Sequence, residues 1–207
     1  MRPANAVAIA LLMVAIAGCS RALLGPEAEA PEVYRLDTPP VATAGTRLPL
    51  ALTVARPRAA ASLDTDRIAV TQPGLRFDHY AGLRWSEPAP QMLQSVLVGA
   101  LQASGRYETV LSAPSRVPTD LLLDVELQRF EARYAAPGAP PLVHVQMQFT
   151  LVDARGGRRV ASFVASAESP AATDRRGEVT AAFERATSEA VVEAVAWLAE
   201  VPPPSDR

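Results

Sequence analysis

Cys19 carries the most distinctive chemistry in the sequence, because it is the only cysteine among 207 residues. A thiolate is a strong nucleophile, so this residue can receive a covalent group. A lone thiol excludes an internal disulfide framework and a metal site built from cysteines. The residues before it, Ile16-Ala17-Gly18, are aliphatic and small, and small side chains let a peptide lie extended in a protease cleft. Cys19 is therefore a candidate for modification beside a cleavage point.

The segment before Cys19 has the pattern of an export signal. Arg2 supplies a positive charge, and eleven apolar residues follow at positions 7–17. A membrane-spanning helix needs about 20 apolar residues. The run is too short for that, but it fits the apolar core of a secretory signal peptide. Together with Cys19 the segment resembles the bacterial lipobox. The alternatives are an ordinary signal peptide with a chance cysteine and an uncleaved anchor.

The lipobox resemblance implies a lipid anchor on Cys19. The thiol would receive a diacylglycerol, and a dedicated peptidase would cut between Gly18 and Cys19. The new amino terminus would then carry a fatty acid such as palmitate. Stable anchoring takes more than one acyl chain, and a triacylated Cys19 meets that requirement. Ser20, rather than Asp, follows the cysteine, which resembles the outer-membrane sorting pattern of Gram-negative bacteria. We therefore expect a protein on the periplasmic face of the outer membrane.

Length and charge limit the remaining possibilities. Removal of residues 1–18 leaves enough chain for one domain with its own core. The net charge of −2 argues against nucleic acid as a partner, since domains that bind it are usually basic. We expect a signal peptide at 1–18, a lipidated tether at 19–32 that is rich in Ala, Pro and Glu, one folded domain at 33–200, and a Pro-rich tail at 201–207.

The other residues that could do chemistry are better explained by structure. His144 alternates with apolar residues and is predicted to be a solvated side chain. His79 falls on the apolar face of its strand and is predicted to be a hydrogen-bonded core histidine. Asp64 and Asp66 lack the glycine-bearing loop of a cation site, and they fit a turn that leads into a strand. No Gly-x-Ser-x-Gly elbow is present, and we expect no enzyme, no metal and no cofactor.

The first half of the domain mixes strand and helix patterns. Strand candidates are predicted at 33–36, 48–55, 67–71, 75–80 and 107–111. Pro73-Gly74 separates two of them, and such a pair indicates the turn of a hairpin. Between Met92 and Leu101 apolar residues recur every three or four positions, which predicts a helix. Ser86 offers a possible cap, prolines suit the first turn, and Ser104-Gly105 ends the helix.

The second half contains the clearest pattern. Apolar and polar residues alternate at 121–128, at 143–151 and through 160–167, which predicts strands with one buried face and one wet face. A long helix follows, whose apolar face contains Val179, Phe183, Ala186, Ala190, Ala194, Trp197 and Leu198. We expect an α/β fold of the α+β type: a mixed sheet of about eight strands with a three-stranded antiparallel meander and two main helices, in a layered sandwich.

Residues 79–110 contain a distinctive order of elements. Tyr80, Arg84-Trp85 and Glu87-Pro88 precede the apolar helix and the entry to the next strand. This order resembles the ABC-type transport auxiliary lipoprotein family. Four other segments agree with it: Tyr34-Arg35-Leu36 after the tether, 54–57 with 63–68, the strand at 123–130, and the closing helix at 181–198. The resemblance covers nearly the whole mature chain.

This resemblance implies a role in lipid transport. Members of the family are periplasm-facing lipoproteins, encoded with systems that carry MCE (mammalian cell entry) domains and sometimes an ABC transporter. Those systems move phospholipids or other hydrophobic molecules between the two membranes. The resemblance implies a non-enzymatic auxiliary that docks an MCE-domain protein and leaves open assembly into a homo-oligomer. Tyr80, Arg84, Trp85 and Pro88 form our candidate interaction patch, because Trp and Arg are common interface anchors.

Two alternatives remain open. Trp85 could instead fill the core where a strand meets a helix. The protein could also be a periplasmic carrier that binds a hydrophobic ligand in its own cavity, for which it would need a continuous apolar pocket. Asp124, Glu126, Gln146 and Gln148 on the wet face of the predicted sheet argue against such a pocket. An envelope lipoprotein that binds peptidoglycan is a third option, which no feature of the sequence singles out.

Overall fold

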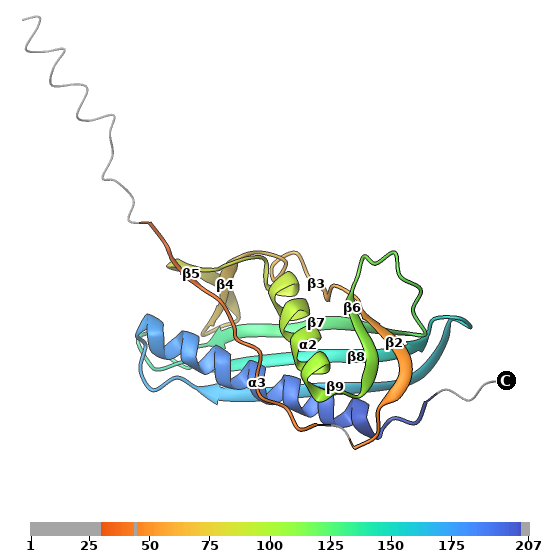
Figure 1. Ribbon diagram of the computed structural model, residues 1–207. Helices are drawn as coiled ribbons and strands as arrows, with labels where there is room; N and C mark the ends of the chain where they lie inside the picture. The colour runs from red at the N-terminus through yellow and green to blue at the C-terminus, as the bar shows by residue number, and fades with distance from the viewer. Residues whose placement is uncertain (1–29, 44, 204–207) are drawn as a thin grey trace, which may run out of the picture. The chain divides into compact units, whose positions relative to one another are not determined.

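A computed structural model describes residues 30–43 and 45–203 of the chain (Figure 1). These residues form one nine-stranded mixed sheet and two helices, which confirms the expected fold class. The sequence pattern missed one two-residue strand, so about eight were expected. In chain order the elements are β1 (Glu32–Tyr34), β2 (Leu48–Val54), β3 (Arg58–Ala59), β4 (Arg67–Gln72), β5 (Arg76–Trp85), α2 (Ala89–Ser104), β6 (Tyr107–Ser112), β7 (Leu121–Arg133), β8 (Leu142–Asp153), β9 (Arg158–Pro170) and α3 (Arg176–Glu200).

β7 is the central strand of the sheet. Along one edge it pairs with β8, which pairs in turn with β9, and both pairings are antiparallel. This confirms the predicted meander. Along the other edge three strands follow one another in parallel: β2 beside the start of β7, β3 beside its middle and β4 beside its end. A single strand of thirteen residues thus organises most of the sheet.

The β4–β5 hairpin also matches the prediction. The two strands are antiparallel, and the turn between them contains the expected Pro73-Gly74 pair. β5 continues well past the predicted end at Tyr80, to Trp85. The pairing of β4 with β5 contains a large bulge. Two residue steps on β4, from Arg67 to Ala69, lie opposite five residue steps on β5. β1 adds a short parallel edge beside the last residues of β5.

α2 begins and ends mainly through backbone conformation. Pro88 is the N-cap, and Pro90 lies in the first turn, where its fixed φ suits a helix. No side chain caps this end, so the predicted cap at Ser86 is wrong. Gly105 ends the helix in the left-handed conformation with φ of 65°, which only glycine adopts without steric cost. The predicted apolar face is buried.

Both helices lie on the same face of the sheet (Figure 1). The predicted face of α3 is buried except for half-exposed Trp197, which stacks on Phe163 of β9 with ring centroids 5.3 Å apart. At the centre of the core, Phe130 of β7 contacts Phe183 of α3 at 5.0 Å. The inward residues of β7, β8 and β9 complete this core, and their polar neighbours face the other way. The opposite face of the sheet therefore carries the polar side chains.

Candidate functional site

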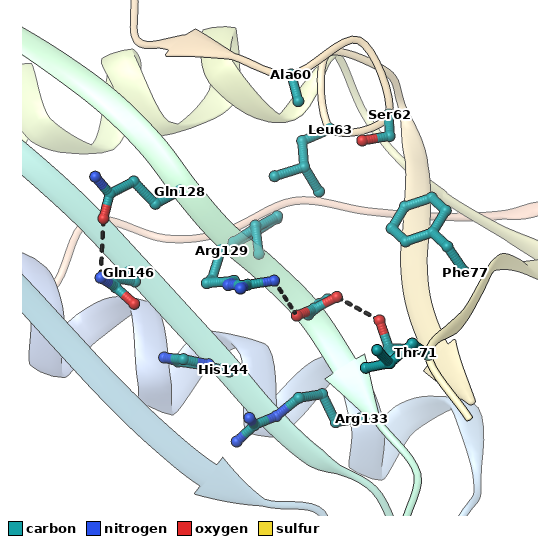
Figure 2. Close-up of a pocket in the computed structure, with 13 residues that line it drawn as sticks. Ala60, Ser62, Leu63, Thr71, Phe77, Gln128, Arg129, Arg133, His144 and Gln146 are labelled. Atoms are coloured by element: carbon teal, nitrogen blue, oxygen red, sulfur yellow. Dashed lines mark hydrogen bonds and ion pairs between the residues drawn. The ribbon is translucent and has the colours of Figure 1, made fainter. Parts of the chain in front are cut away.

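A groove of about 540 Å³ lies beside β7 and β8. Figure 2 shows Leu63 and Phe77 on one side of the cavity and Gln128, Gln146 and His144 on the other. One wall is therefore apolar and the other is polar. The lining residues are Ala60, Ser62, Leu63, Thr71, Leu75, Phe77, Gln128, Arg129, Phe130, Glu131, Arg133, His144 and Gln146.

The groove lies at a gap in the strand pairing along β7. β3 pairs with β7 up to Leu127, and β4 pairs with it only from Glu131 onward. The chain between β3 and β4 leaves the sheet in a loop, so no strand of the described residues lies beside positions 128–130 on that edge. β7 also bulges between Leu127 and Arg129 in its pairing with β8. Together the gap and the bulge open the sheet at this point.

A ladder of glutamine side chains forms part of the polar wall. The amide of Gln146 donates to the Oε1 atom of Gln128 at 2.8 Å, and the amide of Gln128 donates to Gln148 at 3.0 Å. These bonds fix the orientation of the amides and leave other polar valences available, because an amide group has two donors and two acceptor lone pairs. The ladder can therefore hydrogen-bond a polar ligand group without rearrangement.

Glu131 is a buried carboxylate in the groove. Its residue is only 6% exposed, and a buried charge is costly unless it is paired. Thr71 donates its hydroxyl to one carboxylate oxygen, and Arg129 lies 3.5 Å from the other. Arg133 pairs with Glu168. Both arginines of the groove thus have carboxylate partners, so its lining is not a concentrated positive patch.

His144 differs from its sequence-based prediction. The side chain is only 14% exposed, so the prediction of a solvated histidine is wrong. Its Nε2 atom lies 3.2 Å from the Ser166 hydroxyl, while its buried Nδ1 has no hydrogen-bond partner among the described residues. Burial, with a smaller contribution from nearby Arg133, lowers the pKa of His144 below 6.5. The neutral imidazole is thus the favoured form in the groove.

The polar groups of the groove form two connected sets. His144 is bonded to Ser166 through Nε2, and its Nδ1 lies 3.8 Å from Glu168, which pairs with Arg133. Glu131 is bonded to Thr71 and Arg129. Ser62 also lines the cavity, but neither of those hydrogen-bond sets includes it. Within residues 30–43 and 45–203, no three His, Cys, Asp or Glu side chains gather closely enough to hold a metal ion. The arrangement is suited to binding a ligand with polar and apolar parts.

His79 also departs from expectation. It is half-buried beside the edge of Phe77, with ring centroids 5.2 Å apart. Its buried Nε2 atom has no hydrogen-bond partner in the described part of the chain, so the prediction of a hydrogen-bonded core histidine is wrong. The Asp64 to Asp66 segment does form the turn before β4. Asp64 pairs with Arg56 at 2.5 Å, and Asp66 pairs with Arg84 at 2.8 Å.

The four residues of the candidate interaction patch have different environments. Trp85 is 2% exposed and contacts Phe130 and Phe183 at 5.4 and 5.1 Å. Its indole fills the core between β5 and α3, as the alternative interpretation held, and cannot belong to a surface patch. Arg84 is exposed and paired with Asp66. Pro88 is the half-buried N-cap of α2.

Tyr80 belongs to a hydrogen-bonded cluster. Its hydroxyl bonds to the Tyr134 hydroxyl, which donates to Asp174. Burial raises the pKa of Tyr80 to about 12 and also raises the pKa of Tyr134. Both phenols therefore stay neutral at physiological pH. Half-buried Tyr80 of β5 is thus linked, through Tyr134, to the segment before α3. These hydrogen bonds contribute to the stability of the fold.

The predicted lipidation and cleavage residues, Gly18 and Cys19, lie outside the described residues. No helix formed by residues 30–43 or 45–203 has the length and apolar character that crossing a membrane requires.

The groove residues were missed at the level of sequence, although one signal was available. In β7 the buried apolar residues occupy odd positions up to Leu127 and then shift to an even position at Phe130. Because side chains alternate strictly along a strand, such a shift indicates a bulge. The bulge is the point where the groove opens.

Comparisons with known proteins give one family and a consistent fold. A family model described as ABC-type transport auxiliary lipoprotein component matches residues 34–196. No curated protein matches the sequence. Protein XCC0632 from Xanthomonas campestris has a similar crystal structure, with 28% identity and a TM-score of 0.72 over 81% of this chain and 94% of that one.

Two more distant structures support the fold alone. An uncharacterized protein is 18% identical with a TM-score of 0.59, over 83% of this chain and 97% of that one. A hypothetical protein from Chlamydia trachomatis is 8% identical with a TM-score of 0.50, over 74% of this chain and 98% of that one.

Proposed function

Because the chain belongs to the ABC-type transport auxiliary lipoprotein family, we propose that it is a non-enzymatic docking component of a system that moves lipids between two membranes. The partner is an MCE-domain protein of that system. The observation that carries this proposal is the family match, which extends over nearly the whole folded domain. The family is one of transport auxiliaries and not of enzymes, which agrees with a role in binding.

The lipid anchor is part of the same proposal. The Cys19 thiol receives a diacylglycerol, the chain is cut between Gly18 and Cys19, and the new amino terminus is acylated. The anchor holds the domain on the periplasmic face of the outer membrane. The support is the order of charge, apolar core, small residues and cysteine at the N-terminus. Residues 19–31 then link the membrane to β1. At no more than about 3.4 Å per residue, they allow a reach of about 44 Å.

The accessible part of the interaction patch remains a candidate contact surface. Tyr80, Arg84 and Pro88 retain exposed surface, while Trp85 is buried in the core beneath β5. Arg84 is held in place by Asp66, and an arginine fixed in this way loses less side-chain entropy when it binds. A docking role also favours a homo-oligomer, with several copies of the chain around one lipid path. The molar mass of the detergent-solubilised protein measures the number of copies.

The groove supports a second candidate function, a carrier for a hydrophobic ligand. Its volume of about 540 Å³ and the apolar side chains of Leu63, Leu75 and Phe77 favour this alternative. Against it stands the polar wall, since a carrier needs a predominantly apolar pocket. The glutamine ladder and the buried Glu131 make the groove a poor enclosure for an acyl chain.

A pull-down of the acylated protein from native membranes in mild detergent separates the two functions. For docking, we expect an MCE-domain protein to co-purify. Arg84→Ala should reduce its yield without changing the melting temperature, whereas Arg158→Ala, a matched exposed arginine at the start of β9, should not. A stoichiometric phospholipid with no protein partner would favour the carrier and require withdrawal of the docking role.

A further inference from the structure

The β4–β5 turn together with the first residues of β5, residues 73–77 and called the β4–β5 turn from here on, exposes large apolar side chains. Leu75 is 89% exposed and Phe77 is 41% exposed. They are two of six exposed large apolar residues in the described part of the chain. Exposed Arg76 lies between them. Single exposed apolar residues are normal on protein surfaces, but two within three positions, with a cation between them in the sequence, require an explanation.

Leu75 also has an unfavourable backbone conformation. Its φ is 62°, and it is the only described residue other than glycine with a positive φ. That region is sterically costly for a leucine, and glycine or asparagine would suit the turn better. Leu75 gains little from packing in return, because most of its surface is in water. Folding therefore does not account for leucine here, and strain of this kind points to function.

The groove does not account for Leu75 either. Both apolar side chains of the turn line its mouth, and Phe77 faces the cavity in Figure 2. Leu75, however, is almost fully solvated at the outer limit of the groove. A ligand confined to the groove would leave much of this side chain uncovered.

The entry of the chain into the folded domain favours a membrane as the occupant. β1 runs parallel to β5, with Glu32 opposite Leu83. The N-terminal end of β1 therefore points in the same direction as the N-terminal end of β5, where the turn lies. Leu83 is seven residue steps from Arg76 along β5, which corresponds to about 23 Å. The tether of residues 19–31 can span about 44 Å, so a membrane that holds Cys19 is within reach of the turn.

We propose that the β4–β5 turn inserts Leu75 and Phe77 into the interface of the membrane that holds the lipid anchor, with Arg76 at the lipid phosphates. This inference rests on the anchor in the proposed function. Arginine keeps its charged group among headgroups while neighbouring apolar side chains enter the acyl region. A turn with three such side chains is small compared with a stable protein interface, which buries at least about 1,000 Å². The turn would fix the orientation of the domain on the membrane.

The test uses the acylated full chain with Leu75→Cys. Acylation of Cys19 leaves the introduced cysteine as the only free thiol, and it is labelled with a polarity-sensitive fluorophore. The protein is reconstituted in vesicles of phosphatidylethanolamine and phosphatidylglycerol that contain shallow doxyl-labelled lipids. We expect a blue-shifted emission and strong quenching at position 75.

Val117→Cys is the matched control. Val117 is 54% exposed and precedes the start of β7, whereas the β4–β5 turn lies near its end. The two sites are separated by roughly the length of a thirteen-residue strand, about 40 Å. Quenching should be several-fold stronger at position 75 than at 117. Equal quenching at both sites, or none at either, would overturn the inference.

Two further outcomes separate this inference from the proposed function. If the acylated chain floats with the vesicles while position 75 stays solvated, the insertion is wrong and the anchor stands. If mass spectrometry finds Cys19 unmodified and the chain does not float, both are wrong. If the emission of the label shifts to the blue only after a purified partner protein is added, the turn belongs to a protein interface. That result would likewise overturn insertion.

Discussion

Trp85 and Arg84 are neighbours in the sequence, but their side chains leave opposite faces of β5. The indole enters the core, and the guanidinium reaches Asp66 on the surface. We expect Trp85→Ala to lower the free energy of unfolding by about 3–5 kcal/mol, since it leaves a large cavity. Trp85→Phe should cost far less, because it keeps a ring against Phe130 and Phe183. It also removes an indole N–H that has no hydrogen-bond partner in the described part of the chain. Urea denaturation measures both.

Arg84→Ala is the internal control for that experiment. The Arg84–Asp66 ion pair is about 40% exposed on both sides, and such pairs contribute about 0–1 kcal/mol. A normal unfolding curve for Trp85→Ala, combined with loss of partner binding, would contradict the core assignment and return Trp85 to the interaction patch.

The pKa of His144 gives stability a specific pH dependence. Burial and Arg133 lower this pKa, Arg129 adds to the effect, and Glu168 and Glu131 oppose it. Below pH 6.5 the unfolded chain therefore binds a proton that the folded chain does not bind. The contribution is fully present above pH 6.5 and is lost as pH falls toward the lowered pKa.

We expect His144→Gln to reduce the decline in unfolding free energy between about pH 7.5 and about pH 5. Urea denaturation at a series of pH values measures the slope, and His79→Gln is the matched control. An unchanged slope in His144→Gln would show that burial does not hold this histidine neutral.

At the scale of elements, the bulge in β5 depends on one glycine. Gly82 has φ of 70°, and a Cβ atom there would lie 3.0 Å from the Arg176 guanidinium. The backbone conformation alone costs an alanine about 1–2 kcal/mol. We expect Gly82→Ala to lower the melting temperature. Gly177→Ala adds a methyl group in open space in the first turn of α3 and should be neutral or slightly stabilising. Equal melting temperatures for the two variants would contradict a strained bulge at Gly82.

The periodicity of apolar residues predicts the helices and strands of this fold better than it predicts which strands pair. The meander and both helices follow from apolar residues repeated over ten or more positions. β3 has two residues and no period, and its pairing with β7 joins positions 58 and 126. The shifted apolar pattern of β7 indicates the bulge at the groove, but the groove also depends on the gap between β3 and β4, which local sequence does not show. The sequence leaves the burial of Trp85 open, because the predicted strand ends at Tyr80 whereas β5 continues to Trp85.

The whole folded domain has two unlike faces. The helices cover one face of the sheet (Figure 1). The groove opens on the polar face, at the gap in the strand pairing along β7. The buried apolar core extends from Leu36 to Val201, so Val201 at the start of the predicted tail belongs to the core. All the core residues that the structure describes follow the proposed anchor in the sequence. Location and folding should therefore be separable by mutation.

Cys19→Ala tests that separation. We expect the variant to keep the wild-type melting temperature, because Cys19 precedes every core residue that the structure describes. We also expect it to leave the outer-membrane fraction, because one acylation site carries the lipid anchor. Ser20→Asp is the matched control: it keeps the acylated cysteine and should stay membrane-bound while moving from the outer to the inner membrane. Membrane fractionation with thermal denaturation of the purified proteins measures both effects. Recovery of Cys19→Ala in the outer membrane would mean that a surface of the folded domain, and not the lipid, determines where the protein resides.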